Sequence, residues 1–531
     1  MRRLVFAIAA APAMILAFGA SVARAPRAGG PCEAMLAACE KAASTKEAPI
    51  AATAHEPEAQ GAAAKPPADG RRPNIIFILT DDLAWNLVPY MSHVRKMQQD
   101  GVTFANAFVT DSLCCPSRAS IFTGRYPHDT GIYRNTGDDG GYLGFHRRGL
   151  ERASFAVALS ATGYRTAMLG KYLNGYEPGK HPAEPGWTTW TVAGRAYREF
   201  NYSLNRDGKV HHYGQKRDDY LTDVLSKAAT HFVKQSAGTP FFLEVATFAP
   251  HAPYTPAPRD ATTFPGLRAP RSPAFNAAPQ PNAPHWLLPY RDRALSKTDI
   301  AEIDGDFRKR AQSVLAIDAM IGALQAAVAA IGAEKNTYFI FSSDNGLHMG
   351  EHRLMPGKMT AFDSDIRVPL IVTGPGVPAD LTIQEIVENI DLNPTFTELA
   401  GASGSAAVDG HSLAPLLHGR KPPRWRTLAL VEHHHGPDED AADPDAPARR
   451  SGNPPSYEAI RSRSFLYVEY EDGDKEHYDL AADPNELHNN FTALSAGVKK
   501  ALHETLTAAA KCHDAKSCQA AERPTESLTK R

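Results

Sequence analysis

From residue 73 onward, short and continuously apolar segments alternate with segments in which apolar residues recur every three to four positions. Residues 74–80 form an unbroken apolar run, typical of a central strand of a parallel sheet that is covered on both faces. Further strands are predicted at 102–108, 165–169, 241–248, 337–341 and 365–372. Helices are predicted at 92–100, 149–162, 219–235, 304–331 and 386–399. This alternation predicts an α/β fold.

The pattern changes near the C-terminus. Four short alternating segments, at 427–432, 456–461, 465–470 and 476–480, predict a small antiparallel sheet. A helix is predicted at 493–510, and the polar residues 511–531 are expected to be poorly ordered. Residues 255–298 are rich in proline and polar side chains, which indicates a long surface loop that shapes a substrate entrance. Residues 175–215 give no clear assignment.

The N-terminus has the features of an export signal. Arg2 and Arg3 precede an apolar, alanine-rich stretch, and Ala-Arg-Ala at 23–25 resembles a cleavage site. We therefore expect a signal peptide over 1–25, a flexible Ala/Pro-rich segment over 26–71, and an exported protein, periplasmic or secreted. An uncleaved membrane anchor is the alternative, although Pro12 interrupts the apolar stretch. No stable membrane association is expected.

Composition and charge place the chain among ordinary globular proteins. Of its 531 residues, 43% are hydrophobic and 22% are charged, and a net charge of −2 gives no argument for a nucleic-acid partner. The six cysteines fit an oxidising compartment. Two of them are adjacent at 114–115, and the others form two close pairs, Cys32 with Cys39 and Cys512 with Cys518. Local disulfides are the simplest interpretation, but spacing alone leaves the connectivity open.

Acidic and amide side chains follow two of the predicted strands. Asp81 and Asp82 come after the first strand, and Asp344 and Asn345 come after the strand that ends near residue 341. Open α/β sheets bind ligands at the carboxyl ends of their strands. Adjacent carboxylates repel each other unless a cation lies between them. Four oxygen-bearing side chains predict a hard-cation site, for calcium or magnesium rather than zinc. Taken alone, the acid pair also fits a helix N-cap beside a solvated acid.

Residues 113–125 place a nucleophile candidate at the start of a helix. Pro116 suits a first helical position, because its missing N–H would have no partner there. The N–H groups that follow point toward Cys114, and a helix N-terminus attracts an anion. Arg118 adds a planar fork of donors that suits a tetrahedral oxyanion. The segment predicts binding of a sulfate- or phosphate-like group beside a reactive side chain. Two buried thiols ahead of an ordinary helix are the alternative.

Two further polar residues lie just past predicted strands. Lys171 follows the strand at 165–169, and His251 follows the strand at 241–248 within Ala-Pro-His-Ala-Pro. The two prolines restrict the backbone around His251, which suits a role in proton transfer. A surface lysine and a structural histidine in a rigid loop are the respective alternatives.

The remaining histidines fit metal binding less well. His348 and His352 have i,i+4 spacing, but the glycines around them indicate a loop at the rim of a pocket. A triplet at 433–435 begins an acidic, proline-containing run that ends at Asp445. We interpret this run as a solvated or substrate-facing loop.

The segment from Cys114 onward resembles the signature of the sulfatase family. The pattern is Cys-x-Pro-Ser-Arg at 114–118, with Cys115 in the variable position, followed by Thr-Gly-Arg at 123–125. In sulfatases this cysteine is oxidised after translation to formylglycine (3-oxoalanine). The resemblance places that modification at Cys114 and extends over about residues 72 to 500. It implies that a formylglycine-generating system matures the protein.

The resemblance also implies a site and a reaction. The implied ligands of one divalent cation, usually calcium and less often magnesium, are Asp81, Asp82, Cys114, Asp344 and Asn345. The implied catalytic residues are Cys114, Arg118, Lys171, His251 and Lys358. One hydroxyl of the hydrated aldehyde attacks sulfur and displaces the alcohol, and loss of a proton from the second hydroxyl releases sulfate. Lys171, Lys358 and Arg118 stabilise the charge, and His251 or Lys358 protonates the leaving group. The expected substrate is a sulfated sugar or an aryl sulfate.

The fold implied by the resemblance is α/β and alkaline-phosphatase-like, with a large mixed sheet between helices. The expected boundaries are a catalytic domain over 72–420, a C-terminal sheet-plus-helix subdomain over 421–510 and a tail over 511–531. One departure concerns Leu173, where many sulfatases have histidine, so the base for sulfate elimination is open, with Asp81 as a candidate. The motifs are most similar to the N-acetylglucosamine-6-sulfatase branch. A phosphonate monoester or phosphodiester hydrolase is the alternative function.

Overall fold

A computed structural model describes residues 72–404, 407–436, 443, 445–448 and 450–523. The expected signal peptide, the segment over 26–71, and Cys32 and Cys39 lie outside these residues. The α-helices are α2 (Ser92–Asp100), α3 (Cys114–Thr123), α4 (Pro127–Thr130), α5 (Gly141–Arg147), α6 (Phe155–Ala161), α7 (Leu221–Gln235), α8 (Lys297–Ala330), α9 (Asp363–Ile366), α10 (Leu392–Ala400), α11 (Ala414–Leu417), α12 (Ala496–Ala509) and α13 (Ala515–Ala521). The short 3-10 helices are η1 (Trp85–Tyr90), η2 (Leu150–Ala153), η3 (Arg217–Asp219), η4 (Leu288–Tyr290), η5 (Glu334–Asn336), η6 (Asn389–Asp391) and η7 (Phe491–Ala493).

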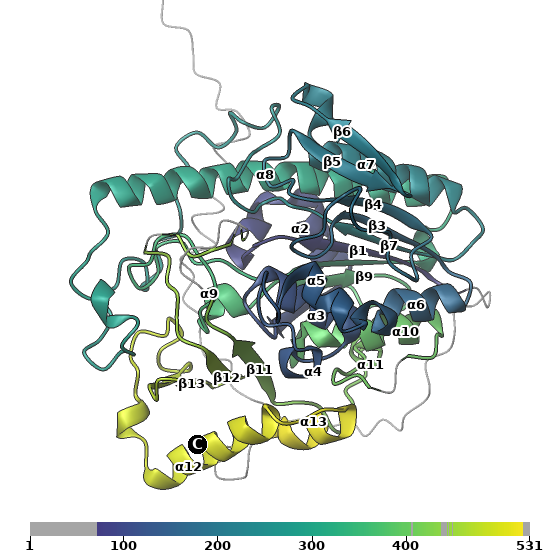
Figure 1. Cartoon of the computed structure of the whole chain (residues 1–531). Coiled ribbons are helices and arrows are strands. Elements are labelled where there is room, and N and C mark those ends of the chain that lie inside the picture. The colour runs from purple at the N-terminus through teal and green to yellow at the C-terminus, as the bar shows by residue number, and fades with distance from the viewer. Residues whose placement is uncertain (1–71, 405–406, 437–442, 444, 449, 524–531) are drawn as a thin grey trace, which may run out of the picture. The chain divides into compact units, whose positions relative to one another are not determined.

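A ten-stranded mixed sheet forms the centre of the fold (Figure 1). Its order is β10-β2-β9-β8-β1-β7-β3-β4-β5-β6. The bounds are β1 (Asn74–Thr80), β2 (Val102–Phe108), β3 (Arg165–Lys171), β4 (Thr189–Ala193), β5 (Tyr202–Arg206), β6 (Lys209–Tyr213), β7 (Phe241–Ala246), β8 (Thr337–Ser343), β9 (Leu370–Thr373) and β10 (Leu381–Glu388). The central strand β1 is parallel to both β7 and β8, whereas β9 runs antiparallel to β2 and β8. The predicted alkaline-phosphatase-like mixed sheet is confirmed.

Helices cover both faces of this sheet. Successive side chains of a strand point to opposite faces. In β1, Ile76 and Ile78 accordingly pack in a core with α2, α7 and α8, whereas Ile75, Phe77 and Leu79 pack in a second core with α3, α6 and α10. This two-sided burial explains the unbroken apolar run of β1. Within the described residues, α8 is the one helix long and apolar enough to cross a membrane, and more than half of its apolar window is buried in the protein.

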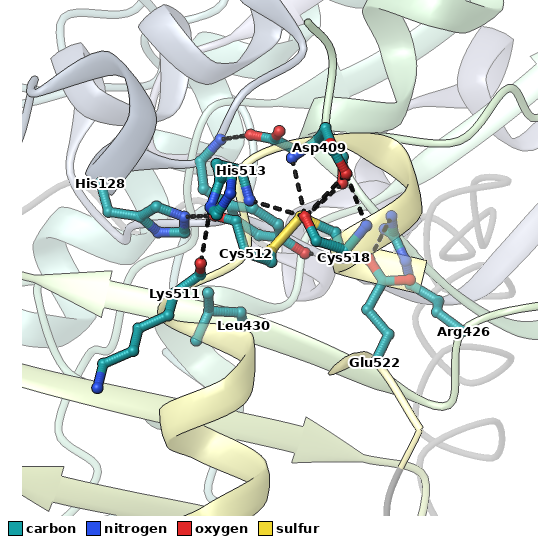
Figure 2. The surroundings of a disulfide bond; sticks show 12 residues. His128, Asp409, Arg426, Leu430, Lys511, Cys512, His513, Cys518 and Glu522 are labelled. Carbon is teal, nitrogen blue, oxygen red and sulfur yellow. Dashed lines mark hydrogen bonds and ion pairs between the residues drawn. A yellow bond between two sulfur atoms is a disulfide. The ribbon is translucent and has the colours of Figure 1, made fainter. Parts of the chain in front are cut away.

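A four-stranded antiparallel sheet follows in the C-terminal part of the chain (Figure 1). It consists of β11 (Leu428–His433), β12 (Tyr457–Ser462), β13 (Phe465–Tyr470) and β14 (Lys475–Asp479). The helix α12 packs on it, and α13 follows. A disulfide joins Cys512 to Cys518 between the two helices (Figure 2). The tail expected to be poorly ordered is therefore structured up to residue 523, because this disulfide and the buried residues of α13 hold it against the sheet.

Polar contacts tie this part to the main sheet. Arg426 is fully buried, and its guanidinium lies 2.9 Å from Glu388, 2.8 Å from Asp391 and 3.1 Å from Glu522. The ring of His128 lies 2.6 Å from the backbone oxygen of Cys512 (Figure 2). A buried charge needs such partners, since an unpaired one costs several kcal/mol.

Several predicted elements were wrong. The helix expected at 149–162 is η2 followed by α6, because Ser154 interrupts it and caps α6. The helix expected at 386–399 starts only at Leu392, because the preceding residues form β10 and pair with β2. The strand expected at 365–372 is reduced to β9, because Asp365 lies in α9 and accepts hydrogen bonds from Thr360.

Other boundaries were incomplete. The unassigned residues 175–215 contain β4, β5 and β6. The long helix begins at Lys297 rather than near residue 304, and Ser296 and Asp299 form a capping box at its start. This Ser-x-x-Asp signal was present in the sequence and marks the true helix start.

Candidate active site

The carboxyl ends of β1 and β8 bring the four predicted cation ligands together. The two strands are parallel neighbours, with Thr80 opposite Ser343. Their last residues therefore end at one edge of the sheet. The Asn345 amide donates to Asp82 Oδ1 at 2.7 Å, and the backbone N–H of Asp82 donates to Asp344 Oδ1 at 3.1 Å.

The backbone at Asp82 is unusual. Its φ of 64° lies in the left-handed region, which costs free energy for a residue other than glycine. The next residue, Leu83, donates its N–H to the Ser343 hydroxyl at 2.8 Å, which holds the turn. This conformation directs the Asp82 carboxylate toward Asn345 and Lys358 instead of into an N-cap. The N-cap alternative for the acid pair is therefore wrong.

Cys114 is the first residue of α3 and is fully buried. Its Sγ lies 3.2 Å from Asp81 Oδ1 and 4.0 Å from Asp82 Oδ1. Burial, and then the charge of Asp344, hold the pKa of the Cys114 thiol well above its usual value. As an unmodified thiol, Cys114 would therefore be a weak nucleophile, because the thiolate is the reactive form.

Arg118 lies one helical turn into α3 and is also fully buried. Its Nε donates to Asp344 Oδ2 at 2.9 Å, and its Nη1 donates to the backbone oxygen of Lys171 at 2.9 Å. Among the described residues, its Nη2 has no hydrogen-bond partner. Burial raises the pKa of Asp344, but the positive charges of Arg118, Lys171 and Lys358 have a larger effect and bring the pKa down to about 2. Asp344 is therefore ionised at any working pH.

Two lysines enter the site from distant elements. Lys171 ends β3, where Gly170 has a φ of 99° and a Cβ would lie 1.9 Å from the backbone oxygen of Ala246. Only glycine allows this approach of β3 to β7. The Lys171 Nζ lies 2.6 Å from Asp81 Oδ2. Burial lowers the pKa of Lys171, but the Asp81 carboxylate raises it well above the usual value, so the ammonium persists.

Lys358 lies in the loop after β8. Its Nζ lies 2.6 Å from Asp82 Oδ1, 2.9 Å from Cys114 Sγ and 2.9 Å from Asp445 Oδ1. Burial lowers the pKa of Lys358, but Asp445 and Asp82 raise it well above the usual value. A permanent positive charge therefore faces residue 114.

His251 lies in the turn after β7. Its Nδ1 lies 2.7 Å from the backbone oxygen of Ala252, and its Nε2 lies 2.5 Å from Asp445 Oδ1 and 3.6 Å from Asp82 Oδ2. Burial lowers the pKa of His251, but Asp445, then Asp82, raise it to about 9. The position next to Asp82 and Lys358 agrees with the predicted location.

Sequence analysis missed Asp445. This residue lies between β11 and β12, in the acidic run that we interpreted as a solvated or substrate-facing loop. Its carboxylate is buried in the site and contacts His251, Lys358 and the amides of Asn135 and Asn174. Several acids of that run look alike in the sequence, and no pattern singles out this one.

The residues at the edge of the sheet fit a cation. The Asn345 Oδ1 is buried and has no hydrogen-bond partner in the part of the chain that the structure describes, although the amide nitrogen of Asn345 has two. One ligand atom from each of Asp81, Asp82, Cys114 and His251 lies within 4.8 Å of the others. The unpartnered Asn345 oxygen and the carboxylates around it form the kind of oxygen ligand set that a hard cation binds. His251, which was predicted as a catalytic residue and not as a cation ligand, adjoins this group of ligand atoms.

The other histidines do not join this site. His348 Nδ1 lies 2.9 Å from Asp365, and His348 and His352 lie outside any helix, so a two-histidine helical metal site is excluded. His433 ends β11 and is fully buried, so the interpretation of the triplet as part of a solvated or substrate-facing loop was wrong for this residue, which belongs to a strand. Leu173 is also buried, in the core beside α3, and offers no base.

The chain was compared with known families and proteins. The profile described as "Sulfatase" matches residues 73–402, and the profile described as "N-sulphoglucosamine sulphohydrolase, C-terminal" matches residues 350–512. An N-acetylglucosamine-6-sulfatase of Homo sapiens is 34% identical over 449 residues, which cover 79% of this chain and 81% of that protein. An N-acetylglucosamine-6-O-sulfatase of Bacteroides thetaiotaomicron is 28% identical over 495 residues, covering 79% and 83%.

Solved structures share the fold. One, a complex with the substrate D-glucosamine-2-N,6-O-disulfate, has a TM-score of 0.66 and 24% identity, covering 82% of this chain and 97% of that one. The phosphonate monoester hydrolase of Agrobacterium radiobacter has a TM-score of 0.62 and 22% identity, covering 82% and 95%. At these identities the likeness concerns the fold, and it does not separate the two activities. The sulfatase profile matches more than half of the chain, and the human relative is 34% identical over 79% of it, so this chain belongs to the sulfatase family and is a sulfatase enzyme.

Proposed function

We propose that this sulfatase hydrolyses sulfate esters of a sulfated sugar, using formylglycine at position 114 and one divalent cation. The observation that carries the proposal is the position of Cys114 Sγ, 3.2 Å from Asp81 and 2.9 Å from Lys358. A nucleophile at that point has carboxylates on one side and an ammonium on the other. Formylglycine supplies an aldehyde hydrate, whose two hydroxyls serve attack on sulfur and release of sulfate.

Asp81, Asp82, Asp344 and Asn345, together with residue 114, would hold the cation. Oxygen donors favour Ca²⁺ over the smaller Mg²⁺, which demands stricter octahedral geometry. A bound cation lowers the pKa of a hydroxyl beside it. The unpartnered Asn345 Oδ1 supports this assignment.

The protein's own side chains would do the rest of the work. Lys171, Lys358 and the free Nη2 of Arg118 stabilise the negative charge of the sulfuryl oxygens. His251, with its pKa near 9, is protonated at neutral pH and donates a proton to the leaving oxygen. Asp81 Oδ1 is the carboxylate atom next to residue 114 and accepts the proton when sulfate leaves. Asp81 would thus take the role of the histidine that many sulfatases have at the position of Leu173.

The names of relatives support a sugar substrate. Several act on N-acetylglucosamine-6-sulfate by name, and two others are named extracellular sulfatases. We therefore propose a 6-sulfated glucosamine unit of a glycosaminoglycan as the substrate, and export by the N-terminal signal over 1–25. We also propose the boundaries 72–420 for the catalytic domain and 421–510 for the C-terminal subdomain.

Mass spectrometry of the peptide around residue 114 tests the modification without a known substrate. Conversion of the cysteine to formylglycine removes roughly 18 Da. Cys114→Ala should abolish hydrolysis of sulfate esters, whereas the neighbouring Cys115→Ala should keep both the mass change and the activity. A Cys114→Ala protein with full activity would exclude the mechanism. Assays of a sulfate ester beside a phosphonate monoester decide between the sulfatase and the alternative hydrolase.

A further inference from the structure

The carboxylate of Asp445 lies among the positive and amide groups of the site. Its Oδ1 lies 2.5 Å from His251 Nε2 and 2.9 Å from Lys358 Nζ. Its Oδ2 accepts hydrogen bonds from Asn135 Nδ2 at 2.8 Å and from Asn174 Nδ2 at 3.4 Å. All four donor residues are buried. One carboxylate thus has four buried donors on its two oxygens, two of them charged.

The contacts with Asp445 occupy N–H groups of His251 and Lys358 that the proposed reaction requires. The imidazole of His251 has two nitrogens, one directed at the backbone oxygen of Ala252 and the other at Asp445. The ammonium of Lys358 has three hydrogens and three neighbours, namely Asp82, Cys114 and Asp445. While Asp445 is in place, neither group has a hydrogen left for a leaving oxygen.

A sulfuryl group would use the same donors. It carries three non-bridging oxygens that share negative charge, and a carboxylate carries two. Asp82 and Asp445 both approach His251 Nε2, at 3.6 Å and 2.5 Å, so two carboxylates share this nitrogen. Their mutual repulsion would be unfavourable without the positive charges of His251 and Lys358. These donors therefore favour the binding of an anionic group.

The backbone holds Asp445 in this position. Its own N–H donates to Asp443 Oδ1 at 2.9 Å, and the same oxygen accepts from Asn135 Nδ2 at 3.0 Å. Asn135 also binds the N–H of Cys115 through its Oδ1. The contact is thus connected to the start of α3, next to residue 114.

We propose that Asp445 is an internal competitor of the substrate, whose carboxylate occupies the position of the sulfuryl oxygens and is displaced when substrate binds. The proposal rests on the proposed function, because it assigns the site to a sulfate ester. If the site is free to bind substrate in only a fraction of the molecules, the apparent affinity for substrate falls in proportion to that fraction. Asp445 therefore lowers the affinity of the site for its substrate, and it favours esters whose negative charge can displace the Asp445 carboxylate.

Inorganic sulfate, the reaction product, is the probe. Its dissociation constant is measured by calorimetry on the full chain as wild type, Asp445→Asn, Asp445→Ala and Asp138→Asn. Asp138→Asn is the control, because it removes the same charge from a side chain that is 97% exposed. We expect both Asp445 variants to bind sulfate about tenfold more tightly, and to lower the KM for a sulfate ester by a similar factor. The Asp138 variant should match wild type.

Unchanged or weaker sulfate binding in both Asp445 variants would overturn the proposal. A fall of kcat/KM with unchanged sulfate binding would assign Asp445 instead to a hydroxyl of the sugar. Melting curves accompany each variant, and Asp445→Ser provides a third one. Failure of all three to fold would also overturn the proposal, since Asp445 would then be structural. Tighter sulfate binding in a protein that cleaves no sulfate ester would leave this inference standing and refute only the proposed function.

Discussion

Lys358 Nζ lies 2.9 Å from Cys114 Sγ, although 244 positions separate the two residues in the chain. The lysine comes from the loop after β8, and the cysteine begins α3. The same ammonium contacts Asp82, one of the proposed cation ligands. The ammonium of Lys358 therefore contacts both the proposed nucleophile and the proposed ion site, and a change at Lys358 should affect the chemistry more than the fold.

Replacing Lys358 by methionine should lower kcat by about a hundredfold to a thousandfold, the usual effect of removing one oxyanion donor. The stem keeps its packing, and only the charge is lost. Kinetics with a sulfate ester measure the effect, and peptide mass should show residue 114 still converted. Lys180→Met serves as control, because this lysine is exposed and pairs only with the exposed Glu177 in the described structure. A Lys358→Met enzyme with wild-type kcat would remove the lysine from the mechanism.

Removal of divalent cations should abolish activity. The Asn345 oxygen lies among converging carboxylates and has no hydrogen-bond partner within the described residues, so dialysis against a chelator should inactivate the enzyme, and Ca²⁺ should restore it better than Mg²⁺. Asn345→Ala should require about tenfold more Ca²⁺ for half-maximal activity, because one ligand is lost. Titration of the chelated enzyme with Ca²⁺ measures both effects. Full activity in excess chelator would contradict the cation site.

The pH dependence of stability should reveal His128. Burial lowers its pKa, but the hydrogen bond to Glu432 raises it from 6.5 to about 9. Because the pKa is raised on folding, the stabilisation is complete below pH 6.5 and is lost as the pH rises through 9. We expect the free energy of unfolding to fall by on the order of 2 kcal/mol between pH 6 and pH 10.

Urea unfolding at several pH values measures this effect. His128→Gln cannot titrate, so its stability should be lower at pH 6 and should change less over the same range. An identical pH slope in wild type and variant would show that other groups are responsible.

Arg426 should be the most sensitive structural cation. Its guanidinium forms ion pairs with Glu388, Asp391 and Glu522, which all lie buried around it. Arg426→Met leaves three buried carboxylates without their cation and should destabilise the protein by about 3 to 5 kcal/mol. Chemical denaturation measures the loss. Arg424→Met, at an exposed position two residues earlier, should change the stability by less than about 0.5 kcal/mol. Equal effects of the two substitutions would refute the role of the network.

The sequence by itself determined the strands β1, β2, β3, β7 and β8, the two acidic strand ends and the position of Cys114 near the start of a helix. These are local signals, because an apolar run, a residue after a strand and a proline in the first turn of a helix can each be recognised within about ten positions. Pro116 was predicted as the first helical residue and is the third, because α3 begins at Cys114. Propensity was misleading where pairing or capping decided the outcome. Residues 381–388 became β10 because β2 offered an edge, and Ser154 divided an expected helix in two.

Only the tertiary structure decided the place of Asp445 and its contact with His251. Asp445 is one acid among several in a run without periodicity, and its importance comes from Lys358 and His251, which approach it from other elements. The same holds for Arg426 and its three carboxylates. The strength of an ion pair depends on distance in the folded structure. The sequence around a charged residue does not indicate which distant residue will lie next to it.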